Sequence, residues 1–343
     1  MIHGLLLVNI RTVEVHCKPV TIIRGTINEL PDDILLEIFR FYMGLHLRYK
    51  NPWHVLVHVC RRWRCLVFAS PRHLHLRLFL KYGIRVKEAL EFWPEFPIVV
   101  HYMPWDLSVT DAIAALEQHD RVCEILIAGP PAPLGKIISA MKKPFPSLVE
   151  LTIKSDGLII PDSFPFLGGS APRLESLELY YVQCPAIEKL LLSTPNLVSL
   201  SLDLLSHSER DYISPEAMVN GLSVLTRLKS LYLTFHWETP RSRSQQEIGH
   251  SSPFPRVVLP ALTYIHFVGE NEYLGDIVSR IDTPLLARIA IKSIDLSVSF
   301  TITPPLSDFI RRTENFGASS QIDVDDPRKR AEIEFFRRDE EGV

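Results

Sequence analysis

Apolar residues recur along most of the chain in one short pattern. In each copy an apolar residue is followed three and five positions later by two more, a spacing that predicts a strand with one buried face. The seven copies are Val122/Ile125/Ile127, Leu148/Leu151/Ile153, Leu174/Leu177/Leu179, Leu197/Leu200/Leu202, Leu228/Leu231/Leu233, Leu262/Ile265/Phe267 and Leu286/Ile289/Ile291. Successive copies begin 23 to 34 residues apart. We therefore expect one strand per copy, separated by longer connections.

The connections between these strands have features of short helices. Helical segments are predicted at 109–118, 134–142, 186–193, 215–225 and 273–281, and two earlier strand–helix units at Leu74/Leu76/Leu78 with 85–93 and at Ile98/Val100 before 109–118. Proline stands two residues before the first apolar position in five copies, where the chain must turn from helix to strand. These prolines are Pro146, Pro172, Pro195, Pro260 and Pro284.

Strand and helix in alternation predict an α/β fold for residues 71–315. Most of the intervals fall in the range of about 20–29 residues that is typical of leucine-rich repeats. We therefore expect an irregular leucine-rich-repeat-like solenoid, with parallel strands on one side and helices on the other. A doubly wound parallel sheet also alternates strands with helices and is the alternative.

Three segments lie outside this pattern. Residues 238–256 are polar and lengthen one interval, which predicts a mobile insertion. Residues 1–26 show only partial alternation, which favours a flexible leader over a loose strand. Residues 316–343 are expected to form a polar C-terminal tail.

The residues that alternate with the buried strand positions must face outward. Several of them are aromatic, namely Tyr180, Tyr232, Tyr264 and His266. Aromatic side chains with a polar tip are frequent at the centres of binding surfaces. We therefore expect these four residues to share one target-binding surface, and an ordinary solvated sheet is the alternative.

Residues 27–70 have the features of two helices. Pro31 suits the first helical position and the two aspartates after it complement the helix dipole, which predicts a helix from Pro31 to Met43 ended by Gly44. Asn51 and Pro52 predict the start of a second helix that reaches Phe68. Two such helices cannot bury all their apolar surface between them, so we expect a partner to cover part of it. A helical hairpin that only caps the strand–helix region is the alternative.

The segment Leu30-Pro31-Asp32-Asp33-Ile34-Leu35-Leu36-Glu37-Ile38-Phe39, followed by Val59-Cys60-Arg61-Arg62-Trp63-Arg64, resembles an F-box motif. In that family the motif docks on the Skp-type adaptor of cullin-RING ubiquitin ligases. By this resemblance the adaptor-binding residues are Leu30, Pro31, Ile34, Leu35, Ile38 and Phe39, with Val59, Cys60 and Trp63 as contacts or supporting core. The resemblance implies a substrate receptor. Its F-box-like helical hook, residues 27–70, would bind the adaptor and through it a cullin, while the strand–helix region would bind an unknown target protein.

Residues 27–315 are also similar to the F-box-like proteins expanded in mushroom-forming fungi. The sequence segments on which this similarity is based include Ser70-Pro71-Arg72 and Phe166 to Leu174. The leader and the last 28 residues are not covered by it. Two alternatives to a substrate receptor remain, a scaffold that does not direct degradation and an α/β enzyme.

Composition and charge narrow the function further. The formal net charge is -3, which gives no reason to expect nucleic acid or an anionic membrane as a partner. The five cysteines are scattered and have no C-x-x-C spacing, which is typical of a reduced, intracellular protein without a structural zinc. No apolar run is long enough to span a bilayer. We expect a cytoplasmic or nuclear protein.

Several segments resemble phosphate-binding, metal-binding, catalytic or nucleic-acid-binding motifs, but a structural role explains each of them better. The stretch from Gly129 to Ile137 departs from a phosphate loop in length and contains prolines that lack the required amide hydrogens. His54 and His58 are four apart but have no evident third metal ligand, and Gly168-Gly169-Ser170 lacks the second glycine of a nucleophile elbow. Arg61, Arg62 and Arg64 are expected on a solvated helix face. We therefore predict no catalytic residue, no metal and no cofactor.

Overall fold

A computed structural model describes residues 27–45, 52–80, 85–204, 213–235, 256–293, 303–313, 320–321 and 332–336. The chain divides into two compact units, Met1–Leu74 and His75–Val343. The predicted leader 1–26 lies outside the described residues, as does the predicted insertion 238–256 except for Arg256.

The first unit is helical in its described part. Its elements are η1 (Ile27–Glu29), α1 (Asp32–Leu45), α2 (Trp53–Val57) and α3 (Arg61–Ala69). The prediction of one helix over 52–68 is wrong, because the chain breaks between α2 and α3. Cys60 is extended at the break, and its Sγ accepts a hydrogen bond from the Trp63 amide at 3.5 Å as an N-cap.

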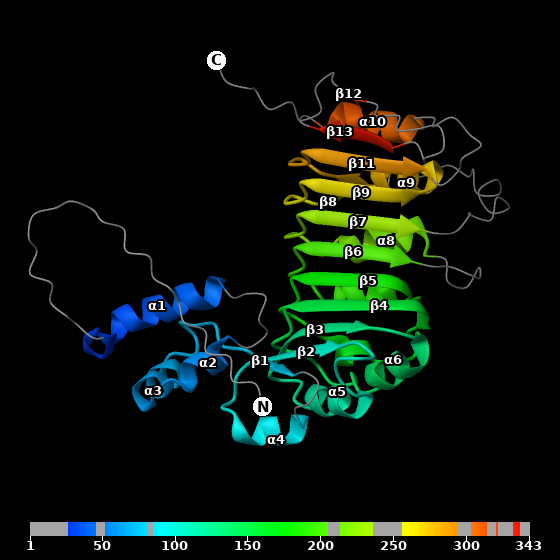
Figure 1. Ribbon diagram of the computed structural model, residues 1–343. Coiled ribbons are helices and arrows are strands. Elements are labelled where there is room, and N and C mark those ends of the chain that lie inside the picture. The colour runs from blue at the N-terminus through cyan, green and yellow to red at the C-terminus, as the bar shows by residue number, and fades with distance from the viewer. Residues whose placement is uncertain are drawn as a thin grey trace, which may run out of the picture. The chain divides into compact units, whose positions relative to one another are not determined.

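The second unit is built on one sheet, with strand order β1-β2-β3-β4-β5-β6-β7-β9-β11-β13-β12 (Figure 1). From β1 to β11 each strand pairs in parallel with its neighbour. The strands are β1 (Leu78–Leu80), β2 (Ile98–Tyr102), β3 (Val122–Ala128), β4 (Glu150–Ile159), β5 (Ser176–Gln183), β6 (Ser199–Leu204), β7 (Ser230–Phe235), β9 (Tyr264–Gly269), β11 (Arg288–Ser293), β12 (Ser320–Gln321) and β13 (Glu332–Phe336). The predicted α/β class is confirmed.

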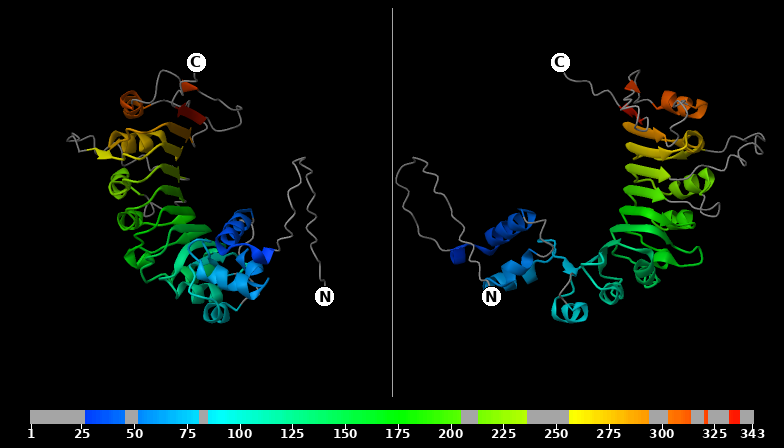
Figure 2. Two further views of the ribbon diagram at one scale, coloured as in Figure 1. Left: turned by 90° about the vertical axis from the view of Figure 1, so that its left-hand side faces the viewer. Right: turned by 45° about the vertical axis from the view of Figure 1, so that its right-hand side comes forward.

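Helices connect the parallel strands. They are α4 (Val86–Phe92), α5 (Val109–Leu116), α6 (Pro131–Ile138), α7 (Ile187–Leu192), α8 (Pro215–Leu222), α9 (Asn271–Ser279) and α10 (Pro304–Arg312), with a short η2 (Phe166–Gly169) before β5 and a small β8–β10 pair (Val257–Val258, Ile281–Asp282). Figure 2 shows α5 to α10 on one face of the sheet. The opposite face, called the open face below, is formed by strand side chains. A doubly wound sheet reverses its strand order, whereas this order follows the chain through β11.

The core of the second unit is a set of aligned apolar rows. The predicted strand positions lie in register from strand to strand, as Leu151 with Leu177 and Leu177 with Leu200. All of them are buried, whereas the residues between them are exposed or half-buried on most of these strands. Each buried aliphatic side chain contributes about 1.5–3 kcal/mol, so these rows hold the strands together.

A tight turn precedes each of six strands. The amide of the first apolar residue donates to the carbonyl three residues earlier, as from Leu174 to Ala171 and from Leu197 to Thr194. Pro172 and Pro195 occupy the second position of these turns, where their fixed φ is favourable. The prolines noted in the sequence therefore shape β-turns.

The prediction of a polar tail over 316–343 is wrong for residues 332–336. They form β13, which pairs antiparallel with β11. Phe335 is buried and lies opposite Ile289. Glutamates alternate with Ile333 and Phe335, so this segment has the period of a half-buried strand within a polar stretch.

Candidate binding surfaces

Helix α1 carries an apolar stripe that reaches solvent. Ile34, Ile38, Phe41 and Leu45 are 46%, 41%, 70% and 65% exposed. They are spaced by four, three and four residues, so they lie on one side of the helix. We call these four residues the α1 stripe. Large apolar side chains gathered on one helix face are typical of a protein-binding surface.

The opposite side of α1 belongs to the core. Leu35 and Phe39 are fully buried, and the Phe39 and Trp63 rings lie 4.7 Å apart between centroids. Among the predicted adaptor-binding residues, these two are therefore inaccessible to a partner. The sequence pattern placed them beside Ile34 and Ile38 in one wide stripe, and only tertiary packing separates the two sides.

The remaining predicted adaptor residues surround the helix starts. Pro31 is exposed, Val59 is 54% exposed in the turn between α2 and α3, and Leu30 is half-buried. Cys60 and Trp63 are also half-buried, in capping and packing roles. Sequence reasoning missed Phe41 and Leu45, although their spacing from Ile34 was a signal that could have found them.

Two arginines of α3 stabilise the unit. Arg62 donates to the Leu30 carbonyl at 2.6 Å and to Asp32 Oδ1 at 2.6 Å, so it ties α3 to the start of α1. Arg64 donates to the Val57 carbonyl at 2.9 Å, at the end of α2. Arg61 and Arg64 are exposed and Arg62 is half-buried, in line with the predicted solvated face, and two of the three also tie the unit together.

Three of the predicted target-binding residues form one aromatic cluster on the open face. The Tyr232 ring lies 5.2 Å from the Tyr264 ring and 6.0 Å from the His266 ring. Arg288 lies over Tyr264, 5.5 Å from its centroid. Tyr232 opposes His266 directly in the sheet register. We call Tyr232, Tyr264 and His266 the aromatic cluster.

Tyr180 lies on the same face but outside that cluster. It is on β5, and its ring accepts a cation–π contact from Lys154 on β4, with Nζ 4.5 Å from the centroid. Strand β6 separates β5 from β7. The four predicted target-binding residues therefore lie on one face of the sheet, but Tyr180 is separate from the aromatic cluster.

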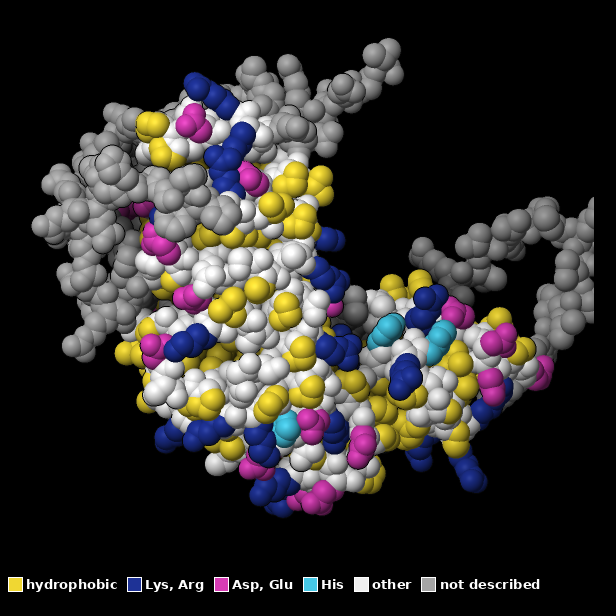
Figure 3. All heavy atoms as spheres, turned by 180° about the vertical axis from the view of Figure 1, so that it is seen from behind, with side chains coloured by type: hydrophobic (Ala, Val, Ile, Leu, Met, Phe, Trp, Pro, Cys, Tyr) yellow, Lys and Arg dark blue, Asp and Glu magenta, His cyan; other side chains and the backbone are white. Residues whose placement is uncertain are grey.

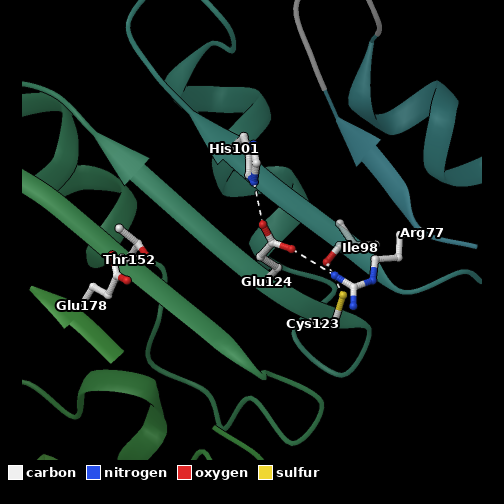
Figure 4. A network of polar contacts seen from close by, with 7 residues as sticks. All are labelled: Arg77, Ile98, His101, Cys123, Glu124, Thr152 and Glu178. Atoms are coloured by element: carbon white, nitrogen blue, oxygen red, sulfur yellow. Dashed lines mark hydrogen bonds and ion pairs between the residues drawn. The ribbon is translucent and has the colours of Figure 1, made fainter. Parts of the chain in front are cut away.

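A polar network occupies the open face over β2 and β3 (Figure 4). Glu124 pairs with His101 Nε2 at 2.9 Å and accepts a hydrogen bond from Arg77 at 3.1 Å. The hydrogen bond from His101, together with Arg77, holds the pKa of Glu124 below its ordinary value. The neighbouring Cys123 thiol is buried and donates to the Ile98 carbonyl, and burial raises its pKa.

The next two strands carry acidic residues without such compensation. Among the described residues, neither Glu150 nor Glu178 has an ion-pair partner. Glu178 accepts a long hydrogen bond from Thr152, at 3.4 Å. Partial burial and the nearby Glu124 raise the pKa of Glu150. The positive charge of Arg77 opposes this rise, and Glu178 and Glu175 add smaller contributions to it. Neither carboxylate has a direct ion pair among the described residues, so Arg77, which pairs with Glu124, offsets the negative charge on this part of the face only in part.

Small residues separate the acidic residues from the aromatic cluster. The register runs from Glu150 through Ser176, Ser199 and Ser230 to Tyr264. All three serines are half-buried. On the helix-covered side, in contrast, acidic and basic side chains are interspersed with apolar ones (Figure 3).

The other segments that looked chemical have structural roles. Residues 131–138 form α6, and Gly168 has a positive φ and lies close to the backbone of Lys143 and Pro144. Cys184 is buried, which raises its pKa to about 12. Within the described ranges, no three or more His, Cys, Asp or Glu residues are grouped so that they could hold a metal ion.

None of the helices in the described part of the chain has the length and apolar character to cross a membrane. A comparison of the sequence with models of known protein families gave no match, and a search of curated proteins found no significant similarity.

Proposed function

We propose that this protein is the substrate-receptor subunit of a cullin-RING ubiquitin ligase. In this proposal the first unit is an F-box-like hook that docks on a Skp-type adaptor. The second unit is an irregular leucine-rich-repeat-like solenoid whose open face holds the target protein. The receptor acts without catalytic residues or cofactors of its own, because it brings the target close to the ubiquitin-carrying enzyme.

The α1 stripe is the observation that carries the proposal. Four large apolar side chains remain in contact with water on a helix whose other side is already packed against Trp63. Burying them against a partner would contribute about 25 cal/mol for each Å² of apolar surface. The stripe follows directly after Leu30 and Pro31, the pair that begins the F-box-like motif. Resemblance and exposure agree on Ile34 and Ile38, whereas Leu35 and Phe39 lie on the buried side of α1.

Features of the second unit support a receptor role. Strands that follow the chain order, with apolar rows in register, are what a repeat array needs to bury its core between neighbouring units. The face opposite the helices then becomes available for recognition, and the aromatic cluster lies on it. An extended face of this kind fits the capture of a protein better than the enclosure of a small molecule.

Calorimetry with a purified Skp-type adaptor tests the proposal. Ile38→Asp combined with Phe41→Asp places two charges in the docking surface, so we expect adaptor affinity to fall by about 100-fold or more. Phe92→Asp is the matched control, because Phe92 is 77% exposed on α4 of the other unit. We expect the control to bind the adaptor like the unchanged protein. Absence of adaptor binding by the unchanged protein, or equal losses in both variants, would refute the proposal.

A further inference from the structure

On the described part of the open face, acidic side chains are paired with cations at β2 and β3 but have no direct ion pair at β4 and β5. At β2 and β3 the carboxylate of Glu124 is compensated by Arg77 and His101. At β4 and β5, Glu150 and Glu178 have no cation within ion-pair distance among the described residues, and Lys154 is engaged with the Tyr180 ring. A positively charged group brought to this place would be attracted by two carboxylates on adjacent strands.

The register fixes two distances between these carboxylates and the aromatic cluster. Glu178 and Tyr232 share one row and are two strand spacings, about 10 Å, apart. Glu150 and Tyr264 belong to one row of the register and are four strand spacings apart, from β4 through β5, β6 and β7 to β9. At about 4.8 Å per spacing the separation is about 19 Å. The three serines between them are short, so the backbone of a bound segment can approach the sheet closely.

We infer that the open face binds a basic segment of a target protein, with a Lys or Arg over Glu150 and Glu178 and an apolar or aromatic residue on Tyr232 and Tyr264. This inference rests on the proposed function for its biological meaning, because it names the chemistry of the target. The negative charge at β4 and β5 disfavours nucleic acid at this place. Separations of about 10 to 19 Å correspond to about three to six residues of extended chain or about six to thirteen of helix.

The test is selection from a displayed library of random 16-residue peptides on the purified full-length protein. We expect enrichment of peptides that combine Lys or Arg with an apolar residue at a spacing within one of those two ranges. Glu150→Lys with Glu178→Lys should weaken the selected peptides by about tenfold or more at low ionic strength. Glu91→Lys with Glu117→Lys makes the same change of net charge at exposed positions in α4 and just after α5, and it should leave binding unchanged.

Further variants keep the result interpretable. Glu150→Gln with Glu178→Gln removes the charge with little change of shape and should weaken binding in the same direction, with the thermal midpoint checked for each variant. Tyr232→Ala with Tyr264→Ala should remove the preference for the apolar residue and retain that for the cation. No enrichment, enrichment of acidic or neutral peptides, or equal binding by the Glu150/Glu178 variants overturns the inference. Adaptor affinity measured on the same samples reports on the proposed function separately.

Discussion

Two adjacent glycines before β5 allow a sharp test of the local structure. Gly168 and Gly169 both have positive φ, of 58° and 70°. A methyl group built on Gly169 meets nothing within 4 Å, whereas on Gly168 it would lie 2.3 Å from the Pro144 nitrogen and 2.4 Å from the Lys143 carbonyl carbon. The two positions share the conformational cost of an L side chain and differ in the clash.

The magnitudes follow from this difference. Gly169→Ala should lower the free energy of unfolding by about 1–2 kcal/mol, the cost of a left-handed conformation. Gly168→Ala adds a backbone clash that requires a shift of about 1 Å to reach normal contact. That shift disturbs the hydrogen bond from the Phe145 amide to the Ser170 carbonyl, at 3.2 Å. We expect a total loss of about 3–5 kcal/mol.

Urea unfolding followed by circular dichroism measures both values. Gly168→Ala should unfold at a clearly lower urea concentration than Gly169→Ala, with a similar dependence on denaturant. Equal losses in the two variants would refute the close approach of Gly168 to the Lys143–Pro144 backbone. Adaptor affinity should stay unchanged in both, because the substitutions lie in the second unit.

Three further predictions concern the core of the second unit, the first unit and the polar network around Glu124. Leu200→Ala should lower the free energy of urea unfolding by about 2–5 kcal/mol, because Leu200 is fully buried. Ser201→Ala on the open face should lower it by less than about 1 kcal/mol. Equal losses would contradict the alternation of buried and outward-facing side chains along β6. Arg62→Met should destabilise the first unit by about 1–2 kcal/mol in thermal unfolding through loss of the contacts to Leu30 and Asp32, and an unchanged midpoint would count against them. Glu124→Gln should lower the free energy of unfolding by about 1–2 kcal/mol at pH 7. Because the pKa of Glu124 is lowered in the folded protein, the difference between the unchanged protein and the variant should shrink as pH falls below 4.5. A difference that does not depend on pH would contradict the pairing of Glu124 with His101 and Arg77.

The sequence alone was sufficient for the parallel strands β3, β4, β5, β6, β7, β9 and β11 of the second unit. Residues such as Leu177 and Leu179 are buried, and Glu178 between them is half-buried on the open face, because a strand alternates its side chains. The turn prolines marked where the strands begin. Strand β13 was missed because five residues with alternating glutamates gave a weak signal in a polar stretch, and its pairing with β11 is a long-range contact.

The first unit was harder to predict because packing decides which side of a helix is exposed. Hydrophobicity could not distinguish Ile38, which is exposed, from Phe39, which packs on Trp63. The break at Cys60 was hidden by the apolar spacing that continued across it. On the open face, alternation identified Tyr232 and Tyr264, but the row that joins Glu150 to Tyr264 requires the register of five strands.

The order of the strands has a consequence for how such a protein can change its length. Within the described part of the main sheet, each parallel strand pairs with the strands of that sheet that come before and after it along the chain. One turn–strand–helix module can therefore be inserted or deleted there without changing the order of the other strands. Each added module would extend the open face by about 4.8 Å. A module inserted between β6 and β7 would increase the distance between Glu150 and Tyr264 by that amount. The distance between the two parts of the open face can therefore change only in steps of one strand spacing.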